Sequence, residues 1–145
     1  MPQPSPGSLA ITGACVVGLI VMLAVFAVDY AAAPAIIPTH VGLSGAVDAR
    51  GPKSTFVIFP ALGFIFAIAS FAIPMVSARS QRPPPPYVTL LGQLVFAEVM
   101  WVLVLAEIST FDIALGRSNA LGPGFFVGIV AVLVTSLAMM ILAVR

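Results

Sequence analysis

Few residues of this chain have side chains that could do chemistry, and they fall into two groups. The first lies in the polar stretch 34–53, which holds the only histidine, His40, together with Asp48 and the only lysine, Lys53. His40 and Asp48 could ligate a divalent metal, but three or four protein ligands are normal and no second histidine is present. We therefore expect no metal and no cofactor. The pair either holds the fold of the loop through hydrogen bonds to its backbone, or contacts a peptide or a lipid headgroup.

The second group is centred on Glu98, which lies near the middle of an apolar run. An acid at that depth of a membrane costs about 2.5–3.5 kcal/mol on insertion scales, and no lysine or arginine lies in an apolar run to neutralise it. Thr135 and Ser136 come to the same level if their segment is an antiparallel neighbour. We expect Glu98 to bond to this pair or to Ser70. Its role is open between a contact that joins helices, a proton or substrate site, and a contact with another subunit.

Composition places the protein in a membrane. Of its 145 residues 61% are hydrophobic and 8% are charged, whereas a soluble domain carries about 25% charged residues. The net charge of +1 argues against nucleic-acid binding, which needs a basic patch. The sequence shows no phosphate-binding loop, and His40, Ser44 and Asp48 lack the spacing of a catalytic triad. We expect a non-enzymatic integral membrane protein.

The apolar runs predict the elements that position these residues. A helix rises about 1.5 Å per residue and needs about 20 apolar residues to cross the hydrocarbon core. Four runs meet this length: residues 9–28, 55–76, 87–106 and 125–144. Short connections predict an all-α, up-down four-helix bundle that forms one domain over residues 1–145, with an ordered loop at 34–53. Glu107 should then lie at a solvated helix end.

The residues of the polar loop 34–53 predict its backbone path and its contacts. The residue before a proline avoids helical backbone angles, so Ile37-Pro38 predicts an extended approach to the loop. A pair between Asp48 and Arg50, or between Asp48 and Lys53, would fix the loop in place. Lys53 also precedes the second run, where its long side chain can reach the headgroups. These features fit a re-entrant loop or one that lies on the membrane surface.

Residues of this loop also resemble a known signature, PTHFNxxGxxDxxGxK, of a bacterial membrane domain of unknown function that also occurs in Sdp-type toxin-immunity proteins. The matching positions are Pro38, Thr39, His40, Gly45, Asp48, Gly51 and Lys53. Val41 and Gly42 replace the usual aromatic residue and asparagine, and Pro52 takes the variable position between the last glycine and the lysine. The resemblance covers residues 10–76. It implies a bacterial inner-membrane protein and, by analogy with some relatives, a sensor or immunity-like role.

Three functions remain open. The first is recognition or immunity, with 34–53 as the surface that contacts a peptide, a toxin or another protein. The second is an accessory subunit of a larger respiratory or photosynthetic membrane complex. The third is a proton- or solute-coupled bundle that acts through Glu98. In each case the helices contact membrane lipids.

Orientation depends on the basic residues at the two ends of the bundle. Three arginines lie on the side of the termini and of the link after the second run: Arg79, Arg82 and Arg145. The opposite side holds Arg50, Lys53 and Arg117, so the count is equal. The link is purely basic, whereas the opposite loops also contain acids. We therefore expect both termini in the cytoplasm.

Overall fold

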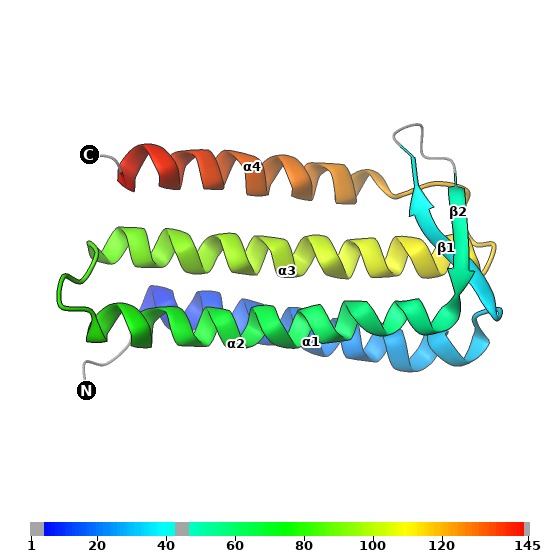
Figure 1. Ribbon diagram of the computed structural model, residues 1–145, viewed down its shortest axis with the longest axis horizontal. Helices are drawn as coiled ribbons and strands as arrows, with labels where there is room; N and C mark the ends of the chain where they lie inside the picture. The colour runs from blue at the N-terminus through cyan, green and yellow to red at the C-terminus, as the bar shows by residue number, and fades with distance from the viewer. Residues whose placement is uncertain (1–4, 43–46, 144–145) are drawn as a thin grey trace.

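The computed structural model of the chain describes residues 5–42 and 47–143. Four long helices run side by side, and a β-hairpin crosses one end of them (Figure 1). The elements in chain order are α1 (Pro6–Ala32), β1 (Ile36–Val41), β2 (Val47–Pro52), the 3₁₀ turn η1 (Lys53–Val57), α2 (Ile58–Arg79), α3 (Pro86–Ala114) and α4 (Pro123–Ala143). The all-α, four-helix prediction is confirmed, with one small sheet added.

The helices begin where the sequence provides a start. Pro6, Pro86 and Pro123 each open a helix, a position where the missing N–H of proline costs nothing. At the first of these, Ser5 caps α1 by accepting a hydrogen bond from the backbone N–H of Ser8 at 3.2 Å. By length and composition, four helices among the described residues are apolar enough to cross a membrane. The chain is a multi-pass membrane protein.

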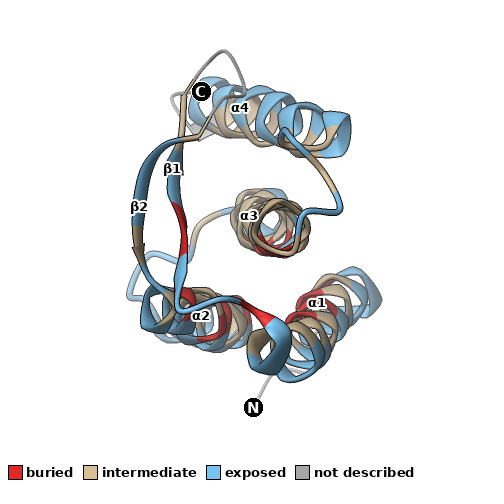
Figure 2. Cartoon of the chain, turned by 90° about the vertical axis from the view of Figure 1, so that its right-hand side faces the viewer, coloured by how far each residue is buried: buried red, intermediate tan, exposed pale blue. Residues whose placement is uncertain are grey.

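Helix α3 is the common neighbour in the bundle. It packs against α1, α2 and α4, and α1 also packs against α2. Viewed along the helices, α3 lies between the α1–α2 pair and α4 (Figure 2). Helix α4 rests chiefly on α3, and most of its large apolar side chains are exposed. In a membrane these side chains face lipid or another protein.

The core forms on the side of α3 that faces α1 and α2. A row of buried residues along α3 recurs every three or four positions, as expected for one face of a helix: Gln93, Ala97, Met100, Val104, Glu107 and Phe111. Close approach of the helices depends on small residues. A Cβ on Gly18 of α1 would lie 2.7 Å from Met100, and one on Gly63 of α2 would lie 2.7 Å from Met22. These glycines let the three helices pack tightly.

A polar bridge supports α2 at Pro74, a residue inside the helix. Proline has no N–H, so the carbonyl of Ser70, four residues earlier, lacks its helical donor. The buried side chain of Gln93 on α3 supplies the missing hydrogen bond, with its amide nitrogen 2.9 Å from the Ser70 oxygen. The same amide nitrogen lies 3.3 Å from the hydroxyl of Thr12 on α1. Gln93 therefore joins three helices at one point.

The stretch between α1 and α2 is ordered, as the sequence predicts, and forms an antiparallel β-hairpin. Strands β1 and β2 pair from Ile36 opposite Pro52 to Val41 opposite Val47, with irregular register on both sides of His40. The backbone pairing gives the segment its order. Residue Gly45 of the predicted signature lies outside the described residues.

Candidate functional site

The base of the hairpin is fixed to the end of α1 by Lys53. Its ammonium group donates to the carbonyl oxygens of Tyr30 at 3.3 Å and Ala33 at 3.4 Å, and lies 4.9 Å from the centre of the Tyr30 ring. The backbone N–H of Lys53 donates to the carbonyl of Ala35 at 2.9 Å. A cation is favourable at a helix C-terminus, where carbonyl groups lack partners. Of the two alternative pairings given for Asp48, the one with Lys53 is therefore not formed.

An aromatic cluster supports the hairpin from below. Ile37 of β1 and Phe56 of η1 are buried together with Phe111 of α3 and Ala33, and the rings of Phe56 and Phe111 meet edge to face at 4.2 Å. Burying side chains of this size contributes about 1.5–3 kcal/mol each. The hairpin is thus attached to the bundle by apolar packing as well as by Lys53.

The hairpin carries exposed polar groups farther from its base. His40 and Asp48 pair through Nδ1 and Oδ1 across the two strands, and their side chains remain 67% and 53% exposed. Asp48 therefore pairs with His40, and not with Arg50 as one alternative predicted. Thr39 packs across Gly51, where a Cβ would come within 2.8 Å of the Thr39 methyl group. The signature residues thus set the shape of the hairpin and leave His40 and Asp48 accessible.

A cleft lies between the hairpin and the helices. Its volume is about 280 Å³. One wall is β1, from Pro38 to Val41, and the rest comes from the start of α2, from α3 and from the segment leading into α4. Its lining is largely apolar, and its polar side chains are those of Thr39, His40, Thr55 and Thr110. This arrangement can bind a flat or extended partner by burying apolar surface while offering a few hydrogen bonds.

A second polar cluster ties the loop between α3 and α4 to α1. Arg117 donates to both carboxylate oxygens of Asp29, at 2.8 Å and 3.2 Å, and lies 3.5 Å from Asp112. The hydrogen bonds that Arg117 donates to Asp29 raise the pKa of Arg117 above its usual value. Because the guanidinium is always charged, this bidentate pair acts as a fixed link at the hairpin end of the bundle.

Glu107 was expected at a solvated helix end, and this expectation is wrong. Helix α3 continues to Ala114, and Glu107 is 0% exposed on the face that packs against α1 and α2. Neither carboxylate oxygen has a hydrogen-bond partner among the described residues. Its three- and four-residue steps to Val104 and Phe111 place it on the buried face of α3, but the sequence does not single out this face because the helix is apolar nearly all round.

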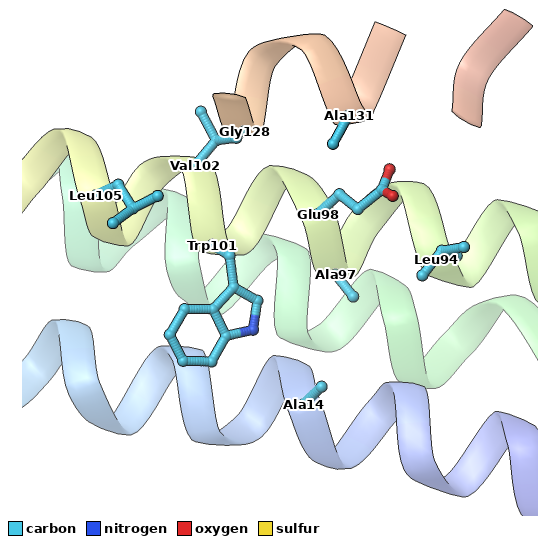
Figure 3. Close-up of a pocket in the computed structure, with 9 residues that line it drawn as sticks. All are labelled: Ala14, Leu94, Ala97, Glu98, Trp101, Val102, Leu105, Gly128 and Ala131. Carbon is cyan, nitrogen blue, oxygen red and sulfur yellow. The ribbon is translucent and has the colours of Figure 1, made fainter. Parts of the chain in front are cut away.

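Glu98 lies on the opposite side of α3, toward α4 (Figure 3). The Thr135 hydroxyl of α4 donates to its Oε1 at 2.8 Å, which is the bond expected from the sequence. The other oxygen, Oε2, is buried without a partner among the described residues. Ser136 is half-buried beside Thr135 on α4, and Ser70 belongs to the Gln93 bridge instead. Glu98 and the hairpin are therefore separate sites.

Comparison with protein families gives one match. The model for "Domain of unknown function (DUF1648)" matches residues 17–64, which span most of α1, the hairpin and the first turns of α2. No curated protein and no solved structure matches the chain. The match supports the expected similarity to an uncharacterised domain family over part of the chain. It covers the elements that carry the hairpin, and α3 and α4 lie outside it.

The described residues contain no group of three or more His, Cys, Asp or Glu side chains that could hold a metal ion. The hairpin brings together His40, Asp48 and Thr39, while Pro38 is buried beneath it and Lys53 lies at its base. This arrangement suits binding, because it joins a firmly anchored strand pair, an accessible polar face and an adjoining cleft.

Proposed function

We propose that this chain is a non-enzymatic recognition protein of a bacterial inner membrane, similar in role to Sdp-type immunity proteins, and that the hairpin is its contact surface. The observation that carries the proposal is the contrast between the base of the hairpin and the part of its strands farther from the base. The base is fixed by Lys53 and by the Ile37–Phe56–Phe111 packing, whereas His40 and Asp48 remain exposed. A preformed surface loses little conformational entropy on binding.

The partner that fits this surface is a protein or peptide on the extracytoplasmic side, with the termini in the cytoplasm. Arg50 and His40 offer donors, Asp48 accepts, and the cleft behind β1 can take an apolar side chain. Membrane lipids contact the outer faces of the helices. The accessory-subunit role uses the same surface differently, as a permanent contact within a large complex.

Site-specific photo-crosslinking tests the proposal. A photoreactive residue at Ala49, which is exposed on β2, should capture one protein or peptide in cells, whereas one at Ser80, at the other end of the bundle, should not. Arg50→Ala should reduce the captured yield several-fold, and the matched change Arg82→Ala should leave it unchanged. Equal capture from both positions contradicts the proposal. Comigration of all the protein with one large complex on a native gel would instead support the accessory role.

A further inference from the structure

Helix α3 buries an acid near the hairpin end of the bundle. Glu107 lies about two turns before the end of α3 at Ala114, on the face that packs against α1 and α2. Its side chain is 0% exposed, and neither oxygen of its carboxyl group has a hydrogen-bond partner among the described residues. Val104 and Phe111, one turn to either side on the same face, are buried as well. Glu107 is therefore closed off from solvent by the packing of the helices.

The charged groups closest to Glu107 in the fold are engaged with one another. Asp29 of α1 is bound by both terminal nitrogens of Arg117, which also contacts Asp112 at the end of α3. Arg117 is thus occupied by two other acids. Asp29 is also close enough for its negative charge to oppose a second negative charge on Glu107.

The other elements that pack against α3 supply no cation either, as far as the described residues go. Lys53, at the base of the hairpin, lies over the ring of Tyr30 and donates to two carbonyl oxygens at the end of α1. The single charged side chain of α2 is Arg79, at the opposite end of the bundle, and α4 contains none within its described residues. His40 of β1 is paired with Asp48. Glu107 therefore faces no group that would stabilise a carboxylate.

These surroundings suit the neutral acid and not its anion. Burial of a carboxylate without water or a cation is far more costly than burial of the protonated group. For Glu107 to lose its proton, water or a cation has to reach it, and α1 and α3 have to separate at this point to admit either. Proton release is therefore linked to opening of the contact between these two helices.

The hairpin is attached to the same two helices. Lys53 binds the end of α1, whereas Ile37 and Phe56 pack with Phe111 of α3, one turn beyond Glu107. Separation of α1 from α3 beside Glu107 would draw these two attachments apart. The position of the hairpin thus depends on a contact that is closed only while Glu107 is neutral.

We propose that Glu107 is a proton-binding site that controls the attachment of the hairpin. With the proton bound, α1 and α3 are packed and the hairpin is held; when the proton leaves to solvent, this end of the bundle opens. The open form holds one proton fewer, so each rise of one pH unit favours it about tenfold. Control of partner binding by this proton rests on the proposed function of the hairpin, whereas the proton site itself does not.

Infrared spectroscopy of the purified protein in phosphatidylcholine vesicles tests the protonation state. The carbonyl stretch of a protonated carboxyl group is separate from the bands of a carboxylate. The spectra are compared between Glu98→Gln and the double variant Glu98→Gln/Glu107→Gln, so that the acid bonded to Thr135 does not contribute. We expect the difference to show a protonated Glu107 at about pH 6, where an exposed glutamic acid is ionised. The band should disappear as the pH is raised.

Hydrogen exchange of β1 and β2, measured in the same vesicles by mass spectrometry, tests the link to the hairpin. Protection factors are used, because they correct for the intrinsic pH dependence of exchange. Over the range in which the Glu107 band disappears, protection of the hairpin should fall about tenfold per pH unit in the native protein. It should not change with pH in Glu107→Gln. His40→Gln removes the only histidine and should keep the response of the native protein.

A protonated band assigned to Glu107, together with a fall in protection that Glu107→Gln abolishes, supports the proposal. Carboxylate bands from Glu107 at about pH 6 overturn it. So does hairpin protection that is independent of pH, or that changes equally in the native protein and in Glu107→Gln. A response lost only in His40→Gln would assign the effect to the histidine instead. If Glu107→Gln does not fold, Glu107→Met, which also cannot ionise, takes its place. Failure of the crosslinks from Ala49 would overturn the proposed function and leave both measurements unaffected.

Discussion

Glu107 is a buried acid that should lower the stability of the fold. Its carboxyl group is fully buried between α1, α2 and α3, and neither oxygen has a partner among the described residues. The nearby Asp29 is already bound to Arg117, so the arginine is engaged elsewhere. A buried polar group without a hydrogen bond costs about 1–3 kcal/mol.

We therefore predict that Glu107→Met stabilises the protein by about 1–3 kcal/mol, because methionine fills a similar volume without a polar group to desolvate. Unfolding in mixed detergent micelles, followed by circular dichroism, measures the change. Ile108→Met, at the next position of α3, is the matched control and should change stability by less than about 1.5 kcal/mol. A loss of stability in Glu107→Met would instead show that the carboxyl group makes a favourable contact.

At the scale of the elements, α2 and α3 are joined by a hydrogen bond that replaces one missing from α2 itself. Pro74 leaves the Ser70 carbonyl without a helical donor, and Gln93 fills that position at 2.9 Å. The two residues should therefore be energetically coupled. Because the site is fully buried, water cannot substitute for the amide.

We predict that Gln93→Leu alone lowers the free energy of unfolding by about 1–3 kcal/mol, since it leaves the carbonyl unsatisfied. In a Pro74→Ala background the helix regains its own N–H, so the same Gln93→Leu change should cost much less. A double-mutant cycle measured by detergent unfolding gives the coupling energy. If the changes in unfolding free energy caused by Gln93→Leu and Pro74→Ala are simply additive, the hydrogen bond from Gln93 to Ser70 does not compensate for Pro74.

The elements also show which features the sequence could predict. Length and apolar character fix the four helices, and depth matching places Thr135 beside Glu98, because both signals depend on local composition alone. The burial of Glu107 and the contact of Lys53 with α1 were missed. Both depend on the angle at which helices meet, which apolar runs without a strong face do not specify. The sequence predicts an ordered loop with an extended approach at Ile37-Pro38, but not the pairing of its two strands, because these are short and contain Pro38 and Gly51.

At the scale of the whole molecule, the up-down path of the four helices gives the bundle two ends that carry different segments. The start of α1, the end of α4 and the link between α2 and α3 lie at one end, and the hairpin lies at the other (Figure 1). The Arg117–Asp29 pair also lies toward the hairpin end, in the connection between α3 and α4. Any crossing of a membrane by all four helices separates these two ends.

This arrangement makes a prediction about accessibility. In a Cys15→Ala background, single cysteines at Ala49 of β2 and at Asn119 of the α3–α4 connection should react together with a membrane-impermeant maleimide added outside intact cells. A cysteine at Ser80, after α2, should react only once the cells are opened. All three positions are exposed, so a difference in labelling reports sidedness rather than burial. The native Cys15 is 0% exposed and should give no background.

The labelling pattern tests the membrane crossings and the orientation of the bundle separately. The orientation is not decided by the basic residues, because their number is equal at the two ends. Matching behaviour of Ala49→Cys and Asn119→Cys, opposite to Ser80→Cys, tests the crossings of α2 and α3, because loss of either crossing would place Ser80→Cys on the same side as one of the other two sites. Which group reacts from outside tests the orientation. External labelling of Ser80→Cys alone would place the hairpin in the cytoplasm, and its partner would then have to be a cytoplasmic protein. Labelling of all three sites from outside would contradict the four-crossing arrangement itself.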